Sequence, residues 1–415
     1  MHLRPPATPG GSGRGPASRR HPRGRLRPDR QGAYGADDRR RRRLPHPRSA
    51  PGPDQRLLPG QRLEACRLPG AVPGRLRRGH RAGALARLRL PGRRAPRRRR
   101  PLPPRHRCRH SQIRSGPSHR PRLPGGLMAE IVLGYSASHA PMMSANPESA
   151  PEAMRDRFFG ALDYVRERVQ ESGAQAVVLM SGEHFTNFFL DNLPQLSVGI
   201  GETHLGPVEK WLGIPRTIVP GHPDLATAIL SGTMQRGFQP SVSSRLTVDH
   251  GFMTVYHQLS PTMDLPLVPI VMNCTTPPLM TLRQAWDFGA AVGAAIRDFD
   301  GPDRVALVGA GGLSHFVGEP RVGDIDEDFD LWFLRQLELG CPPELLDIAN
   351  DELMLAGNGT GEVRAWVACA AAMQGTRTTA LNYEPIAEWI NGMGVVLHEP
   401  HDREAAEAPA SIFVP

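Results

Sequence analysis

The stretch "VALVGAGGLSHF", residues 305–316, carries the signals that decide the fold. Its first residues are small or β-branched and apolar, which is typical of a strand buried on both faces of a sheet. Three glycines then end the strand, and Ser314 and His315 follow them. A lone histidine after a core strand is more often a turn residue than a functional group. A functional role for His315 therefore needs support from the rest of the chain.

Strands and helices alternate around this stretch. Apolar runs predict strands over residues 130–139, 174–184, 266–273 and 304–312. Apolar residues at helical spacing predict helices over residues 151–173, 224–237 and 282–299, and the pattern turns helical again over residues 326–339, 342–355 and 361–373. This alternation predicts an α/β fold, with one domain built on a mainly parallel central sheet covered by helices.

The glycines of "GAGGLS" invite comparison with a dinucleotide-binding fingerprint. Ser314 stands where the third glycine of that motif belongs, and no acidic residue ends a following strand about 20 residues further on. We therefore discount binding of a nicotinamide dinucleotide.

The charge of the chain divides at Met128. Residues 1–127 hold 35 arginines, no lysine and five acidic residues, whereas the other 288 residues hold 16 basic and 36 acidic residues. The first part has one aromatic residue, Tyr34, and too little apolar material for a core, so we expect a disordered basic region of low complexity.

Three explanations of residues 1–127 compete. A nucleic-acid-binding arm would normally mix lysine with arginine and interleave aromatic residues, and a transit peptide would be shorter and rich in serine. The third explanation is an upstream stretch translated in error from GC-rich DNA, and it fits the composition best. "MAEIVLGYSASH" from Met128 then reads as the natural start, and peptides from residues 1–127 in the natural protein would refute this.

Residues 128–415 are long enough for one sizeable core. Cys274, Cys341 and Cys369 show no paired spacing, so a disulfide framework is not expected. No apolar run reaches the length of about 18 residues that a membrane span needs, and no secretory signal surrounds Met128. We expect a soluble cytoplasmic protein without nucleic-acid or membrane partners.

Histidines follow three of the predicted strands. His139, His184 and His315 each come just after a strand, and His250 follows another apolar stretch in "LTVDHGF". Ligands of open α/β sheets collect beyond the carboxyl ends of the strands, so these side chains are expected at one edge. Each histidine alone is more often structural than functional, but three at one edge are harder to attribute to chance.

Two histidines and one carboxylate on one face of a metal ion leave positions open for a substrate and O₂, an arrangement suited to Fe(II). Glu183 is one candidate for the carboxylate, although neighbours along an extended chain point to opposite sides. Glu362 is the other, and it equally suits the first turn of a helix. The spacing does not choose between them.

The chain resembles the class III extradiol ring-cleaving dioxygenases, the group that includes the protocatechuate 4,5-dioxygenase β subunit, gallate dioxygenases and dihydroxyphenylpropionate dioxygenase. The resemblance lies in blocks that cover nearly all of residues 128–415 and none of residues 1–127. These blocks are "SASHAP" (136–141), "SGEHFTNFF" (181–189), "GHPDLA" (221–226), "VDHGF" (248–252), "GGLSHF" with "PRVGDIDEDFD" (311–330), "GEVRAW" (361–366) and "NYEPIAEWINGMG" (382–394).

The resemblance implies a role for each candidate residue. His139, His184 and Glu362 would hold Fe(II), His315 would be the acid/base of the active site, and His250 would assist proton transfer. The reaction would cleave a catechol with O₂ to a muconic semialdehyde-type product, and the first choice of substrate is a carboxylated ring such as protocatechuate or gallate. Some members of that family need a small α subunit that covers the site, and the resemblance leaves open a separate subunit of this kind or a homo-oligomer.

Two other functions stay open. A metal-dependent hydrolase would use the same histidines to activate water and would ignore O₂. A non-catalytic interaction module would need no metal at all. Turnover of catechols by the iron-loaded protein distinguishes the dioxygenase from both.

Overall fold

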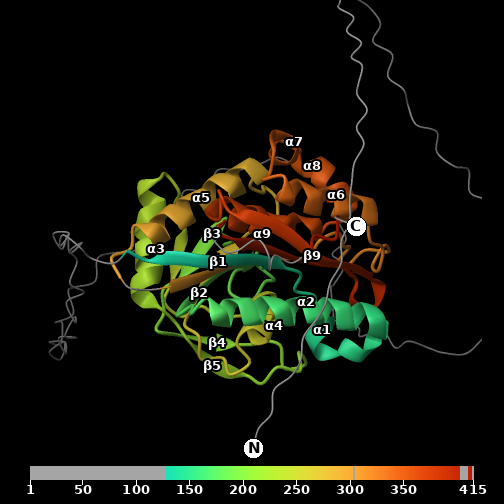
Figure 1. Cartoon of the computed structure of the whole chain (residues 1–415), viewed down its shortest axis with the longest axis horizontal. Helices are drawn as coiled ribbons and strands as arrows, with labels where there is room; N and C mark the ends of the chain where they lie inside the picture. Colours follow the sequence, from blue (N-terminus) through green and yellow to red (C-terminus); the bar gives the residue numbers. More distant parts are fainter. Residues whose placement is uncertain (1–127, 302–303, 402–409, 414–415) are drawn as a thin grey trace, which may run out of the picture. The chain divides into compact units, whose positions relative to one another are not determined.

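The structure is a computed structural model, and it describes residues 128–301, 304–401 and 410–413 (Figure 1). The predictions for residues 1–127, both the disorder and the translation in error, lie outside the described residues.

A single large sheet forms the centre of the described part of the chain. Its eight strands run in the order β6-β3-β7-β2-β8-β1-β10-β9. Four neighbours in the middle, β7, β2, β8 and β1, are parallel, and β10 and β9 add an antiparallel pair at one edge. The bounds are β1 (Glu130–Ala137), β2 (Ala176–Gly182), β3 (Leu196–Gly199), β6 (Ser241–Ser243), β7 (Leu267–Met272), β8 (Arg304–Ala310), β9 (Arg377–Ile386) and β10 (Asn391–Glu399); a separate pair is β4 (Thr203–Gly206) with β5 (Thr217–Pro220).

Helices cover both faces of this sheet. In Figure 1, α2 (Glu152–Glu171) and α4 (His250–Leu259) lie below it, and α5 (Leu282–Arg297) lies above it. The upper layer also contains α3 (Pro223–Gln235) and α9 (Val363–Ala372), which pack against α5. The remaining helices are α1 (Met142–Ala145), α6 (Glu327–Glu338), α7 (Pro343–Leu346) and α8 (Asn350–Leu353). The predicted α/β fold with a mainly parallel central sheet is confirmed.

The core follows from the alternation of side chains along the central strands. In β2, Val177 and Leu179 pack with α2 and α4, whereas Val178 and Met180 pack with α3, α5 and α9. All seven residues of β2 are buried, which explains why this strand appears in the sequence as a continuous apolar run. Each fully buried side chain of this kind contributes about 1.5–3 kcal/mol.

The C-terminal hairpin is the main difference from the sequence prediction, which expected only helices in the last third. β9 alternates between buried and half-buried residues and carries polar side chains such as Asn382 and Glu384, so its apolar signal is weak. The helix expected over residues 342–355 is also split into α7 and α8, because Asp347 to Ala349 leave the helical path.

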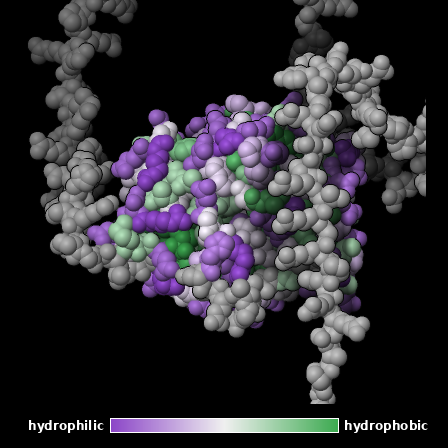
Figure 2. All heavy atoms as spheres, turned by 45° about the horizontal axis from the view of Figure 1, so that its top comes forward, coloured by the Kyte–Doolittle hydropathy of each residue, from purple (hydrophilic) through white to green (hydrophobic). Residues whose placement is uncertain are grey.

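In the described part of the chain, Cys274, Cys341 and Cys369 are buried free thiols, as the absence of paired spacing predicted. None of the described helices combines the length and the apolar character that crossing a membrane requires. On the face drawn in Figure 2, hydrophilic side chains are interspersed with hydrophobic ones. Scattered apolar side chains are ordinary on protein surfaces.

Candidate metal centre at the carboxyl ends of the parallel strands

The three strand-end histidines meet at one edge of the sheet. His139 follows β1, His184 follows β2 and His315 follows β8, and these three strands are parallel neighbours. All three imidazoles line a cavity of about 520 Å³, together with His250 and Glu362. The structure therefore brings all five sequence-predicted residues to one cavity.

Glu362 contacts both metal-ligand candidates among the histidines. Its Oε2 lies 2.8 Å from His139 Nε2, and its Oε1 lies 3.1 Å from His184 Nε2. Glu183, the other carboxylate that the sequence left open, accepts hydrogen bonds from the backbone N–H of Thr186 (2.6 Å) and of Asn187 (3.3 Å). Glu183 thus holds the turn after His184, and Glu362 is the carboxylate between the imidazoles.

The glycines of the opening stretch explain how Glu362 reaches this position. Glu362 ends a short helical turn before α9, and the backbone N–H of Gly312 donates to its Oε2 at 2.5 Å. A Cβ atom at Gly311 would lie 2.6 Å from the Glu362 carbonyl oxygen, so only glycine allows this close approach. The buried Arg364 fixes the same turn by donating to the carbonyls of Gly361 (2.7 Å) and Met280 (2.6 Å).

The hydrogen bonds at Nδ1 decide which ring nitrogen faces Glu362. His139 Nδ1 lies 3.1 Å from the Gly251 carbonyl oxygen, and His184 Nδ1 lies 3.2 Å from Asp249 Oδ2. A carbonyl and an ionised carboxylate only accept hydrogen bonds, so Nδ1 carries the proton and Nε2 carries a lone pair in the neutral ring. Metal-binding histidines have the same arrangement, with the second nitrogen bonded to a carbonyl or a carboxylate.

Two lone pairs and a carboxylate at these distances repel each other unless a proton or a cation lies among them. His139 and Glu362 are buried, and His184 is partly buried, so water screens this repulsion poorly. Burial alone would raise the pKa of Glu362, but the imidazoles of His139 and His184 outweigh it and hold this pKa well below its usual range. The donor set therefore fits a divalent metal ion.

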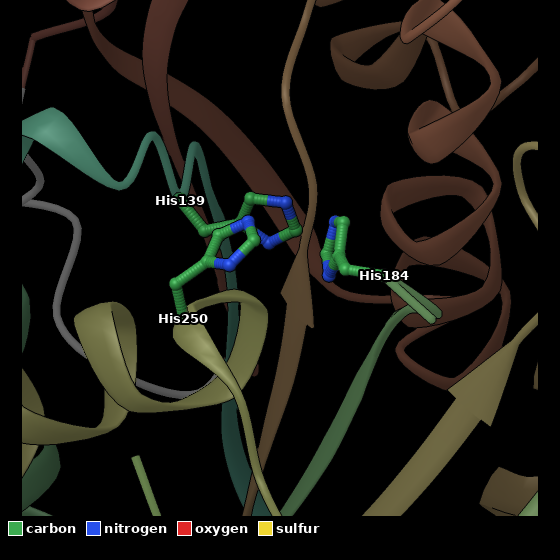
Figure 3. Close-up of side chains that lie close together, drawn as sticks. All are labelled: His139, His184 and His250. Carbon is green, nitrogen blue, oxygen red and sulfur yellow. The ribbon is translucent and has the colours of Figure 1, made fainter. Parts of the chain in front are cut away.

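A third imidazole lies close to this pair. In Figure 3, His139 comes from the end of β1, His250 from the first turn of α4 and His184 from the segment after β2. The rings of His184 and His250 are 4.2 Å apart, and the candidate ligand atoms of all three histidines lie within 4.8 Å of one another. His139 and His184 thus belong to two overlapping donor sets, which differ in whether Glu362 or His250 is the third member.

His250 has its own carboxylate partner, Glu209. Glu209 Oε1 accepts from the backbone N–H of His250 at 3.1 Å and lies 2.7 Å from His250 Nδ1. The carboxylate fixes the orientation of the ring and leaves Nε2 toward the other imidazoles. Glu209 was not predicted, because nothing in its neighbourhood in the sequence marks it as a partner of a residue 41 positions away.

His315 is also held by a hydrogen bond at its Nδ1. Its Nδ1 donates to the Leu313 carbonyl at 2.9 Å, so the neutral ring presents the lone pair of Nε2 to its surroundings. A Cβ atom at residue 359 would lie 1.9 Å from His315 Nε2, which explains the glycine at this position. His315 is only 6% exposed and lines the cavity.

The buried Asp330 of α6 fixes the segment that carries His315. Its carboxylate accepts from the Ser314 N–H (2.7 Å), the Ser314 hydroxyl (2.8 Å) and the Tyr383 hydroxyl (2.9 Å). Burial, with a smaller contribution from Asp326, raises the pKa of Asp330 to about 7 against the opposing effect of these hydrogen bonds. No local pattern distinguishes Asp330 from the other acidic residues of this helix.

This raised pKa predicts how stability changes with pH. The unfolded chain ionises Asp330 near pH 4 and the folded chain only near pH 7, so its stabilising effect is complete below pH 4 and is lost as pH rises through 7. A change of this size corresponds to about 4 kcal/mol. Asp330→Asn should flatten the fall of Tm between pH 4 and pH 7, whereas Asp328→Asn, at an exposed position of the same helix, should leave the profile as in the wild type. Equal profiles for all three proteins would contradict the prediction.

Comparisons with known proteins identify the family of the chain. A family model described as "Catalytic LigB subunit of aromatic ring-opening dioxygenase" matches residues 133–394. A "2,3-dihydroxyphenylpropionate/2,3-dihydroxicinnamic acid 1,2-dioxygenase" from Klebsiella pneumoniae (strain 342) is 28% identical over 310 residues, which cover 63% of this chain and 96% of that protein. The protein of the same name from Escherichia coli O81 (strain ED1a) is 28% identical over 309 residues, with the same coverage. A solved structure, of an uncharacterised Escherichia coli K12 protein, aligns with 64% of this chain and 99% of that one at 15% identity and a TM-score of 0.44.

Proposed function

The chain belongs to the family of catalytic LigB subunits of aromatic ring-opening dioxygenases and is an extradiol ring-cleavage dioxygenase, and from this premise we propose its metal, its reaction and the role of each site residue. Residues 128–415 form the catalytic domain. They hold a non-haem Fe(II) through His139, His184 and Glu362, and they cleave a catechol with O₂ to a muconic semialdehyde-type product.

One observation carries this proposal: the Nε2 atoms of His139 and His184 face the two oxygens of the same buried carboxylate. Enzymes of this family depend on a metal, and Fe(II) suits two imidazoles and one carboxylate because positions stay open for the diol and for O₂. The bound metal ion would supply the activation of O₂ and would make the diol protons more acidic.

The protein itself supplies proton transfer and orientation. His315 accepts a proton from a diol hydroxyl at Nε2, because its Nδ1–H is committed to the Leu313 carbonyl. His250 donates a proton during ring cleavage, and the Glu209 carboxylate at its Nδ1 orients the ring. The cavity walls limit the access of water to these groups.

The pairing of Glu209 with His250 predicts the effect of a variant. Glu209→Gln keeps the size of the side chain and an acceptor oxygen but removes the negative charge, so only weaker, neutral hydrogen bonds hold the His250 ring. We expect kcat to fall about 10- to 100-fold, as for other residues that orient a histidine, with one iron per chain retained. Glu202→Gln, an exposed glutamate nearby in the sequence, is the control and should keep wild-type kcat. Loss of iron from Glu209→Gln would instead place His250 among the ligands.

Anaerobic reconstitution tests the proposed function directly. The full chain is loaded with Fe(II), mixed with a panel of catechols and exposed to air, and a yellow ring-fission product with the mass of substrate plus O₂ is expected. A sample loaded with Zn²⁺ should stay colourless, because zinc does not support the redox chemistry of O₂. Bound iron without consumption of any catechol would overturn the proposal and would favour a metal-dependent hydrolase.

The implied partners stay predictions. A small α subunit would cover the site, and a homo-oligomer would need no second chain. Light scattering of the purified protein measures directly whether it forms a homo-oligomer. The protocatechuate- or gallate-type ring that the resemblance implies also stays a prediction.

A further inference from the structure

The cavity has a polar interior and an apolar outer wall. The proposed catalytic side chains are largely buried, whereas Phe185, Trp211 and Val317 line the same cavity at 43%, 59% and 55% exposure. These three residues therefore lie at the side of the cavity that faces solvent. Trp389 and Ile390 add further apolar surface to the lining. A cavity of about 520 Å³ belongs to the size class of sites for multi-ring ligands, so a bare catechol leaves space beside this wall.

The lining of the cavity contains carboxylates but no lysine or arginine among the described residues. Among the described residues that line the cavity, Glu183 and Glu362 are acidic, and no lysine or arginine occurs. Two more carboxylates, Asp249 and Glu209, contact its histidines from behind. Lys210 precedes Trp211 in the chain, but its side chain is exposed and does not line the cavity. A ring carboxylate held against the apolar wall would lose water and would meet no lysine or arginine there, which is costly.

Two apolar wall residues are held in a strained backbone conformation. Phe185 and Ile390 both have φ of 55°, in the left-handed region that residues other than glycine rarely adopt. Such a conformation costs about 1–3 kcal/mol, and it persists only where the surrounding structure enforces it. Both residues line the cavity, and Phe185 follows His184 directly. Holding Phe185 and Ile390 in the cavity wall therefore lowers the stability of the fold.

Resting on the proposed ring cleavage, we propose that the substrate is a catechol with an uncharged apolar substituent, alkyl or aryl, which packs against Phe185, Trp211 and Val317. The diol faces the histidines and Glu362, and the substituent lies toward the solvent side of the cavity. This assignment differs from the carboxylated ring that the resemblance implies.

A substrate series tests the assignment. The iron-loaded full chain is assayed with catechol, 3-methylcatechol, 3-phenylcatechol and protocatechuate, and Kd is measured without turnover from tryptophan fluorescence under anaerobic conditions. We expect kcat/KM to be at least tenfold higher, and Kd at least tenfold lower, for 3-phenylcatechol than for protocatechuate. The reverse order would overturn the assignment and leave the ring-cleavage function standing. Cleavage of none of the four by iron-loaded protein would instead count against the function itself.

Variants at the wall test its role separately. Val317→Arg places a cation at the solvent side of the cavity, so the ratio of kcat/KM for protocatechuate to that for 3-phenylcatechol should rise at least tenfold. Leu355→Arg is the matched control, because Leu355 is 72% exposed and lies outside the cavity. Lys210→Ala should leave both values unchanged. A loss of protocatechuate cleavage in Lys210→Ala would show that this lysine binds a substrate carboxylate and would overturn the assignment.

Discussion

Glu362→Gln is expected to lower the affinity for Fe(II) more than about 100-fold and to abolish ring cleavage. The amide has nearly the same shape, but it carries no charge to balance a divalent ion. Its NH₂ group would also point a donor at one of the positions where the carboxylate now meets His139 Nε2 and His184 Nε2. Substitutions of residues that merely orient metal ligands cost 10- to 100-fold in affinity, so loss of a ligand should cost more.

Metal content and thermal stability measure this effect without relying on turnover. A ligand at 100 times its Kd stabilises a protein by about 2.7 kcal/mol, which for a domain of this size raises Tm by about 4–5 °C. We expect this rise on adding Fe(II) to the wild type and not to Glu362→Gln. Glu183→Gln is the matched control, because Glu183 lines the same cavity but holds the turn at Thr186, and it should keep one iron per chain. A Glu362→Gln protein with wild-type iron content would disprove the ligand assignment.

The central strands were predictable because parallel strands are buried on both faces. β1, β2, β7 and β8 therefore appear in the sequence as apolar runs, and each was predicted within a few residues of its bounds. The antiparallel hairpin of β9 and β10 was missed. β9 is half-buried, and Gly392 and Gly394 of β10 fit close against Asp330 and Leu313, a tertiary contact that no local pattern reveals.

The site was predictable to the extent that topology determines it. Parallel neighbouring strands end at the same edge, so His139, His184 and His315 were expected to meet there. The carboxylate was not determined by spacing, because Glu362 lies 178 residues from His184 and arrives through the contact of its turn with Gly311 and Gly312. Glu209 was missed for the same reason, since it contacts His250 from 41 positions away. Asp330 lies only 16 residues from Ser314, but it is one of several acidic residues in the same helix and nothing local distinguishes it.

His315→Asn is expected to separate proton transfer from metal binding. Asparagine keeps a donor for the Leu313 carbonyl, which His315 Nδ1 now contacts at 2.9 Å, but it has no basic nitrogen toward the cavity. Loss of a positioned base typically costs 10²- to 10⁴-fold, so kcat should fall by about this factor while one iron per chain is retained. His139→Ala, in contrast, should lose the iron itself.

The pH dependence distinguishes a lost base from a disturbed site. As the pH rises, the diol ionises in solvent before it binds, so a base on the enzyme matters less and the deficit of His315→Asn should shrink. A variant that merely disturbs the cavity should keep a constant deficit over the same range. His401→Ala, at an exposed histidine, serves as the control and should match the wild type throughout. If His315→Asn lost its iron, or if its deficit did not change with pH, proton transfer would have to be assigned to another group of the cavity, with His250 the first candidate.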